Sequence, residues 1–464
     1  MQKKYNQIKL FLLLFTSLIF QSFSYSQQIA FPGAEGYGQF AKGGRGGDVY
    51  HVVNLNDDGL GSFRYGIETA VGPRTIVFDI SGNILLSKKL MINTPNITIA
   101  GQTAPGDGIT LAGNTLYIQA NDVVIRYIRV RFGDTSGQQA DAISINKGKN
   151  IILDHVSASW SVDETLSCQS RHVDLLTVQW CMISESLQNS IHEKGAHGYG
   201  GIIGATRQTF HHNLYAHHSS RSPKVTGRRH CEVDFRNNVI YNWGFNNCYD
   251  GTGSYMNWVN NYYKSGPATK QNVKHRIFQL SDAEIADVRN NSPEDSKTYE
   301  TSLYAEGNYM YGSDIVTKNN WEGGIDFINS ATEEKNRAKS PVFDAPKITQ
   351  QTALASYPLV ISGAGASLKR DAIDTRIEKE VQNGTFTYGN KGLIDSPKDV
   401  NGLPVLKSSN PLPDTDRDGM PDLWEKKNNL NPNNPNDRNN YHEKGYTMLE
   451  IYLSELVKDG KYID

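Results

Sequence analysis

Short runs of β-branched and aromatic residues recur along the middle of the chain, separated by Gly, Asn and Ser. The runs begin at residues 96 (NITIAG), 123 (VVIRYIRVRFG), 151 (IILDHVSASW), 174 (DLLTVQWCMI), 209 (TFHHNLYAHH), 231 (CEVDFRNNVIYNW), 254 (SYMNWVNNYYKSG) and 302 (SLYAEGNYMYG). Such runs predict strands joined by turns. Most neighbours lie about 22 to 28 residues apart, a period typical of stacked coils that bury their apolar faces against one another.

We therefore expect an all-β protein with a right-handed parallel β-helix. The alternative is an antiparallel β-sandwich or a propeller. A sandwich would show hairpin turns at intervals of about 8–12 residues, and these runs are spaced more widely. The less regular residues 312–399 are expected to form long loops and late coils.

One position of the repeat holds asparagine four times, at Asn213, Asn238, Asn261 and Asn308. The first two intervals are 25 and 23 residues, and the third is 47, close to two turns of the coil. Stacked asparagines can hydrogen-bond along a coil axis, so we expect a ladder at this position. The alternative is four unrelated turn asparagines, because Asn is common in turns.

The first residues have the features of a secretory signal peptide. Lys3, Lys4 and Lys9 precede an apolar stretch over residues 10–20, and small residues follow near residue 26. The stretch is too short to span a membrane, although a membrane anchor is the alternative. We expect residues 1–26 to be removed, 27–400 to form the β-helix and 401–464 to form a linker and tail. The mature chain should be soluble and secreted, extracellular or periplasmic.

The charge, hydropathy and cysteine content of the chain argue against nucleic-acid and membrane partners, a disulfide scaffold and a zinc ribbon. The formal net charge of −2 becomes about −5 when the three signal lysines are removed, so no basic excess indicates nucleic acid. No later segment could cross a bilayer, and we expect a monomer without a membrane partner. Four dispersed cysteines are too few for a disulfide scaffold, and they lack zinc-ribbon spacing.

The tail contains the spacing of a calcium loop. Positions 1, 3, 5, 6, 9 and 12 of a twelve-residue segment are Asp414, Asp416, Asp418, Gly419, Asp422 and Glu425. Alternating carboxylates point inward, glycine permits the sharp turn, and the last glutamate can bind through both oxygens. The segment resembles the DxDxDG repeats of thrombospondin type 3, and the alternative is an acidic linker. We assign this predicted calcium site to stability, with the terminal TMLEIYLSELV expected to pack behind it as an amphipathic helix.

A second acidic group lies in the coil region. Asp141 and Glu164 are one coil apart, so they should lie side by side, with Asp163 adjacent. Carboxylates that meet on one face repel one another unless a cation joins them. Oxygen ligands in an exported protein indicate calcium, and solvated loop acids are the alternative.

The sequence around these residues is similar to polysaccharide lyase family 1, the pectate lyases. DAISINKGKNIILDHVSASW resembles the DxI and WiDH core of that family, and RSPKV resembles its RxPxxR motif. FPGAEGYGQFAKGGRGG and GQTAPGDGITL resemble its bacterial secreted members. The resemblance covers roughly residues 30 to 310. It implies a pectin-lyase-like β-helix and calcium-dependent, endo-type β-elimination of de-esterified polygalacturonate to 4,5-unsaturated oligogalacturonides.

Transferred position by position, the resemblance implies that Arg221 is the catalytic base. Because arginine is a weak base, the alternative role is an electrostatic clamp on the enolate. The implied calcium ligands are Asp141, Asp163 and Glu164, the implied substrate contacts are Lys194, Lys224 and Arg228, and the implied structural residues are Asp154 and His155. Asp163 enters as a compensating ligand, since Gln139 and Cys168 stand where many members carry carboxylates. Thr226 replaces the second arginine of RxPxxR.

Several other interpretations remain open. The pairs His211–His212 and His217–His218 could contribute to a zinc site, although we interpret them as cleft-lining and packing residues. A polygalacturonase-type hydrolase would need catalytic aspartates clustered for acid and base work. A pectin lyase acting on methylated pectin, or a non-catalytic β-helix that binds glycans, would not need calcium at Asp141.

Overall fold

The computed structural model describes residues 27–226, 231–283 and 300–457. The predicted signal peptide, residues 1–26, and Arg228 lie outside the described residues. Among the described residues, no helix is both long and apolar enough to span a bilayer.

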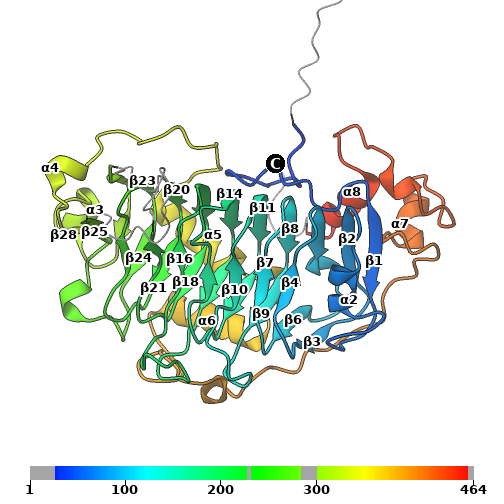
Figure 1. The fold of residues 1–464 in the computed structure, drawn as a ribbon, viewed down its shortest axis with the longest axis horizontal. Coiled ribbons are helices and arrows are strands. Elements are labelled where there is room, and N and C mark those ends of the chain that lie inside the picture. Colours follow the sequence, from blue (N-terminus) through cyan, green and yellow to red (C-terminus); the bar gives the residue numbers. More distant parts are fainter. Residues whose placement is uncertain (1–26, 227–230, 284–299, 458–464) are drawn as a thin grey trace, which may run out of the picture.

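The chain winds into a parallel β-helix, as the sequence predicts (Figure 1). Sheet 1 has ten strands in the order β1 (Asp48–Val52), β2 (Arg74–Phe78), β5 (Ile97–Ala100), β8 (Val123–Arg126), β11 (Gly148–Asp154), β14 (Val173–Gln179), β17 (Arg207–His211), β20 (Cys231–Arg236), β23 (Ser254–Val259) and β26 (Ser302–Glu306). Sheet 2 has nine strands, β27 (Tyr309–Met310), β24 (Tyr262–Lys264), β21 (Val239–Tyr241), β18 (Leu214–Ala216), β15 (Met182–Ser184), β12 (Ser157–Ser159), β9 (Ile128–Arg131), β6 (Ile109–Ala112) and β3 (Gly82–Leu85).

Two shorter sheets complete the coils. Sheet 3 has four strands, β13 (Leu166–Ser167), β10 (Ile143–Ile145), β7 (Leu116–Ile118) and β4 (Leu90–Ile92). Sheet 4 has five strands, β16 (Ile202–Ile203), β19 (Lys224–Val225), β22 (Cys248–Asp250), β25 (Phe278–Asp282) and β28 (Ile325–Asn329). Every neighbouring pair is parallel, as successive coils of one solenoid require.

The core is a column of apolar side chains in register along the axis. In sheet 1, Leu153 pairs with Val178, which pairs with Phe210. Phe210 pairs with Phe235, whose ring stacks on Trp258 of the next strand at 4.1 Å. All five side chains are fully buried. Because the same inward position stays apolar in every coil, each coil covers the apolar face of the next.

The asparagine ladder predicted from the sequence is present. The side-chain amide of Asn213 donates to Oδ1 of Asn238 at 2.9 Å, and Asn238 donates to Asn261 at 3.0 Å. Asn261 donates to Asn308 at 2.9 Å. The prediction that this last step spans two turns is wrong, since β23 pairs directly with β26. The 47-residue interval is one coil, because β25, which lies within it, pairs with β22 and β28 of sheet 4 like any other coil strand. The connection before β25 is lengthened by a segment that includes η2 (Gln271–Val273).

Residues 27–47 cross the outer face of sheet 1. Gly38 N donates to Thr177 Oγ1 at 2.8 Å, and Glu35 N donates to Gln179 Oε1 at 3.1 Å. A Cβ atom on Gly38 would lie 2.2 Å from the carbonyl oxygen of Ile151, so only glycine allows this approach.

Residues 312–399 contain helices that the sequence analysis did not predict. These are α3 (Asp314–Lys318), α4 (Glu333–Asn336), α5 (Ala353–Gly363) and α6 (Ala372–Asn383), with the short helices η4 (Ser367–Lys369) and η5 (Pro397–Val400). Arg131 of β9 donates to Asp371 at 2.7 Å and to Asp374 at 2.9 Å, and all three side chains are buried. Ion pairs thus attach α6 to the outer face of sheet 2.

The tail docks against the first coils, on the opposite end of the helix from β28 (Figure 1). It contains α7 (Asp422–Lys427), η6 (Asp437–Asn439) and α8 (Met448–Glu455), while α2 (Phe63–Glu68) and η1 (Gly101–Thr103) belong to the first coils. Met420 and Leu449 pack on Val77 and Ala100 of sheet 1. His51 Nε2 lies 3.1 Å from the carbonyl oxygen of Arg417, which ties the loop before α7 to β1.

Candidate active site

Three predicted carboxylates lie together beside sheet 3. The register of β10 with β13 pairs Ile143 with Leu166, and this brings Asp141 next to Glu164. Glu164 N donates to Asp141 Oδ1 at 3.1 Å. One oxygen from each of Asp141, Asp163 and Glu164 lies within 4.8 Å of the others. The structure therefore assembles these three side chains from two successive coils.

The electrostatics of this group favour a bound cation. Burial of the carboxyl group raises the pKa of Asp141 to about 8, and the negative charge of Asp163 contributes to the rise. An oxygen-only donor set of three carboxylates suits calcium, a hard cation. The residues present therefore fit the ion that the sequence analysis predicts.

Two histidines that the sequence analysis did not select hold Asp163. His197 Nε2 lies 2.9 Å from Asp163 Oδ1, and His192 Nε2 lies 3.7 Å from the same atom. Burial alone would raise the pKa of Asp163, but the hydrogen bond and charge of His197 bring it below its ordinary value. Both histidines lie in the segment IHEKGAHGYG. Two histidines close together in a glycine-rich segment were the sequence feature from which a functional role could have been predicted.

His192, His197 and Asp163 could in principle form a metal site of their own, because their ligand atoms lie within 4.8 Å of one another. However, the two imidazole rings stack 3.8 Å apart at an interplanar angle of 7°. Parallel stacked rings direct their nitrogen lone pairs side by side, whereas a shared ion needs lone pairs that converge. The arrangement therefore suits one hydrogen bond, from His197 to Asp163, with His192 stacked on His197 and its Nε2 3.7 Å from the same oxygen.

Arg221 extends over the same group of carboxylates. Its Nη1 pairs with Glu164 Oε1, and its Nε donates to the Tyr249 hydroxyl at 3.3 Å. Its guanidinium carbon lies 4.2 Å from the centre of the Tyr199 ring. The backbone of Arg221 has φ of +60°, a left-handed conformation that is uncommon outside glycine. Three side chains and an unusual backbone conformation thus fix the guanidinium in one place.

The predicted substrate contacts fall in different environments. Lys224 begins β19, where its ammonium lies 3.5 Å from Asp250 and 5.5 Å from the centre of the Tyr249 ring. Lys194 is exposed in the loop that carries His192 and His197. Lys224 is therefore next to the residue that contacts Arg221, whereas Lys194 lies at the rim.

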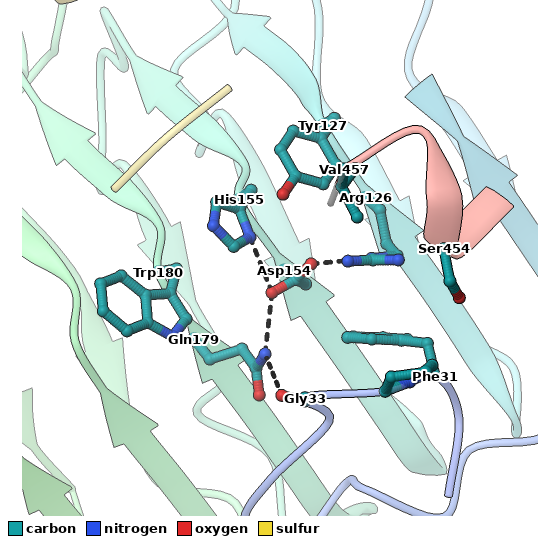
Figure 2. A pocket seen from close by; sticks show the side chains of 11 residues that line it. Phe31, Gly33, Arg126, Tyr127, Asp154, His155, Gln179, Trp180, Ser454 and Val457 are labelled. Atoms are coloured by element: carbon teal, nitrogen blue, oxygen red, sulfur yellow. Dashed lines mark hydrogen bonds and ion pairs between the residues drawn. The ribbon is translucent and has the colours of Figure 1, made fainter. Parts of the chain in front are cut away.

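Asp154 and His155 lie at a different corner of the coil, where they help to line the pocket shown in Figure 2. The buried Asp154 carboxylate accepts from Arg126 Nε at 2.7 Å and from Gln179 at 2.8 Å, and His155 Nδ1 lies 2.8 Å away. Burial would raise its pKa, but His155 and Arg126 together lower it below the ordinary value. Phe31, from residues 27–47, covers the Arg126 guanidinium at 3.7 Å. This network joins the N-terminal segment to the coils.

The histidine pairs are buried packing residues. The His212 ring stacks on Trp180 at 4.3 Å, and His217 Nε2 lies 3.0 Å from Glu380 of α6. His218 Nδ1 lies 2.7 Å from the Ser186 hydroxyl. Burial lowers the pKa of His212 to about 4 and that of His218 to about 3. Within the described residues, none of the four histidines belongs to a group that could hold a metal ion, and the four cysteines are free, buried thiols.

The tail forms a second carboxylate group. Asp414, Asp416 and Asp418 lie within 4.8 Å of one another, and Asp418 also lies close to Glu425 and Asp437. Carboxylate oxygens of Asp416, Asp418, Glu425 and Asp437 are buried without a hydrogen-bond partner. Buried, unpaired carboxylates need a cation, and an all-oxygen set suits calcium.

The structure changes the predicted membership of this tail group. Asp422 does not join it, because its carboxylate accepts from the backbone and hydroxyl of Thr415 at 2.8 Å. Asp437 joins instead, from η6, well beyond the twelve-residue spacing. The sequence carried no spacing signal for Asp437, since it reaches the loop only through the folded tail.

Known proteins resemble this chain over most of its length. "Probable pectate lyase C" of Neosartorya fischeri is 36% identical over 436 residues, covering 92% of this chain and 94% of that protein. The protein of the same name from Aspergillus terreus is 36% identical over 450 residues, covering 95% of this chain and 97% of its own. Both are fungal, so the bacterial type stays a prediction. The crystal structure of jun a 1, the major allergen from cedar pollen, shares the fold at 18% identity, with a TM-score of 0.50 over 72% of this chain and 92% of that one. No protein-family profile matches the chain.

Proposed function

The chain belongs to the pectate lyase family, and on that premise we propose that it is a calcium-dependent, endo-acting lyase of de-esterified polygalacturonate. The observation that carries the proposal is the contact between Arg221 and Glu164 within a group of three carboxylates. Elimination from a uronate needs a cation beside the sugar carboxylate and a group that handles the C5 proton. The three carboxylates of the site offer ligands for the cation, and Arg221 is the group that handles the C5 proton.

The calcium ligands in this proposal are Asp141, Asp163 and Glu164. Calcium bound there would neutralise a substrate carboxylate and so acidify the neighbouring C5 proton. Arg221 takes that proton, and the electrons of the C5–H bond form a C4–C5 double bond. The C4–O bond breaks with its electron pair on the oxygen, which takes a proton from water and leaves with one half of the polymer. The product is a 4,5-unsaturated oligogalacturonide.

The surroundings of Arg221 keep its guanidinium in position during this step. Tyr199 lies against one face of the guanidinium at 4.2 Å, and the Tyr249 hydroxyl accepts from Nε at 3.3 Å. A base that is already oriented loses little free energy in reorganising when it takes the proton. In this proposal Lys224, which pairs with Asp250 in the structure, binds a second uronate carboxylate, and Lys194 reaches one from the exposed loop.

The same proposal includes export and a monomeric state. The basic and apolar pattern of residues 1–26 supports removal of a signal peptide and secretion to the periplasm or the medium. The tail carboxylates support a second, structural calcium ion.

The test is the ultraviolet absorbance of unsaturated product on polygalacturonate at alkaline pH, with calcium and with chelator. Wild type should show a calcium-dependent rise, and Arg221→Lys should reduce the rate at least about 100-fold, since a positioned general base contributes that much or more. Arg207→Lys is the matched control, because Arg207 pairs with Asp174 on sheet 1. Reducing sugar without absorbance would identify a hydrolase instead. Activity on methylated pectin that survives chelation would identify a pectin lyase.

A further inference from the structure

Aromatic and basic side chains continue from Arg221 along the coil axis. Phe245 is exposed, with 43% of its surface accessible, in the loop between β21 and β22. Its ring lies 6.4 Å from Tyr199 in an edge-to-face arrangement, and Tyr199 lies under Arg221. The ammonium of Lys270 lies 5.9 Å from the centre of the Phe245 ring.

These residues come from successive coils. Tyr199 forms a parallel bridge with Ser220, directly before Arg221. Phe245 N donates to the carbonyl oxygen of Ser219 at 2.9 Å. Lys270 N in turn donates to the carbonyl oxygen of Gly244 at 3.1 Å. Neighbouring coils are about 4.8 Å apart, so the side chains form a row with one member per coil.

The loops that carry Phe245 and Lys270 are held by specific contacts. A Cβ atom on Gly244 would lie 2.9 Å from Ser219 Cα, so the loop can lie this close only with glycine before Phe245. Asn242 Oδ1 accepts from Ala268 N at 2.8 Å, which fixes the loop before Lys270. A ring and an ammonium fixed in advance lose little conformational freedom when a ligand binds.

The chemistry of the pair fits an acidic sugar. An exposed ring offers an apolar surface for the C–H face of a pyranose, and an ammonium offers a charge for its carboxylate. Among the described residues, Lys270 has no carboxylate partner, whereas Lys224 pairs with Asp250. Asn246, the next residue after Phe245, is itself held, since its Oδ1 accepts from Arg276 at 2.8 Å.

We propose that Phe245 and Lys270 form a substrate subsite for a galacturonate residue of the polymer, on the side of Arg221 that faces the later coils. The proposal rests on the proposed function, because it takes the substrate to be a polyuronate that crosses Arg221. The subsite binds a galacturonate unit away from the bond that is cleaved. It therefore affects substrate affinity and the length of polymer needed for tight binding.

The test compares the steady-state kinetics of Phe245→Ala and Lys270→Gln with wild type on long polygalacturonate and on trigalacturonate. On the polymer, each variant should raise KM about 3- to 10-fold and leave kcat within about twofold, as loss of one stacking or charged contact implies. The Lys270→Gln effect should shrink as salt is raised. On trigalacturonate the KM values of the variants should approach that of wild type, because a short chain bound at Arg221 gains less from contact with Phe245 and Lys270.

Phe386→Ala and Lys318→Gln are matched controls. Phe386 has 41% of its surface accessible, near the end of α6, and Lys318 is exposed in α3. Equal effects in variants and controls, or polymer KM values within twofold of wild type, would overturn the subsite. Calorimetry of oligogalacturonate binding to the same variants tests whether Phe245 and Lys270 contact the ligand, even if no turnover is observed. Wild type that binds but does not cleave would reject the proposed function, while a weaker Kd in Phe245→Ala would still support the subsite.

Discussion

Chelating calcium should open the tail, and the opening should be visible in α8. Met420, within the predicted calcium loop, packs with Leu449 of α8, and Trp424 Nε1 donates to Glu455 at 2.8 Å. Loss of the ion leaves buried carboxylates of Asp418, Glu425 and other tail residues unpaired. A structure that unfolds locally takes with it the elements packed on it. We therefore expect α8 to exchange its amide hydrogens faster when calcium is removed.

The size of the effect follows from linkage. A site with Kd near 1 μM, within the range of oxygen-ligand calcium loops, contributes about 4 kcal/mol at 1 mM calcium. Local opening of α8 should then become about 1,000-fold more frequent in chelator. Hydrogen exchange followed by mass spectrometry measures this ratio on peptides covering residues 448–455, with peptides of the sheet 1 core as the internal reference.

Two variants distinguish the group of carboxylates that lie together in the structure from the group expected by spacing. Asp437→Asn should remove most of the calcium effect on α8, because its buried oxygen has no other partner. Asp422→Asn should retain the effect, since its carboxylate is occupied by Thr415. If Asp422→Asn loses the calcium response while Asp437→Asn keeps it, the geometry of the loop has been read wrongly.

The same group predicts a pH dependence in chelator. Burial, with the charges of neighbouring carboxylates, raises the pKa of Asp418 to about 8 and that of Glu425 to about 7. These acids hold their protons more tightly when folded, so their contribution to stability is complete below about pH 4 and is lost as pH rises through 7 to 8. In chelator, α8 should thus exchange faster at pH 9 than at pH 5, after correction for intrinsic exchange. Calcium should reduce this difference.

Three further changes have definite expected outcomes. His197→Ala should raise the calcium concentration for half-maximal activity about 10-fold, because His197 holds Asp163, whereas His197→Gln can still donate and should shift it less. Asn238→Leu should lower the free energy of unfolding in urea by about 3 kcal/mol, since it leaves the carbonyl of Phe210 and the amide of Asn213 without partners. The control Asn383→Leu, at an exposed position, should leave the free energy of unfolding unchanged. Arg131→Met should lower the free energy of unfolding by about 3–5 kcal/mol, because it removes the main partner of the buried carboxylates of Asp371 and Asp374 at the start of α6. A thermal melt would detect the loss of stability.

The sequence predicted those features that repeat with the period of the coil. Asp141 and Glu164 are separated by one coil, and β10 pairs with β13 to bring them together. The asparagines occupy one position of successive coils, and each contacts the next. In a solenoid, residues one period apart are neighbours in space, so a linear spacing is enough to predict contact.

Contacts between coils and inserted segments could not be predicted in this way. Asn261 and Asn308 are neighbours although longer connections bring their separation to 47 residues, about twice that of the other steps, so the count of turns was wrong at that step. Asp437 reaches Asp418 through the fold of the tail, and α6 reaches sheet 2 from far along the chain. In each case the closing contact depends on loop length and packing, which have no period.

The candidate active site combines both kinds of contact, which explains why only part of it was predicted. The period of the coil places Asp141 beside Glu164, whereas Arg221 was expected from the resemblance of RSPKV to the RxPxxR motif and not from spacing. The segment inserted between β15 and β16 supplies His197 against Asp163, while Tyr199 at its end bridges to Glu164 and Ser220 as part of the coil and lies under Arg221. A β-helix holds its coil residues rigidly, so changes in affinity or specificity are most readily made in such inserted segments, which can vary without disturbing the core. Among residues that touch the site, substitutions in the insertion should therefore alter calcium or substrate affinity, while those in the coil should remove activity.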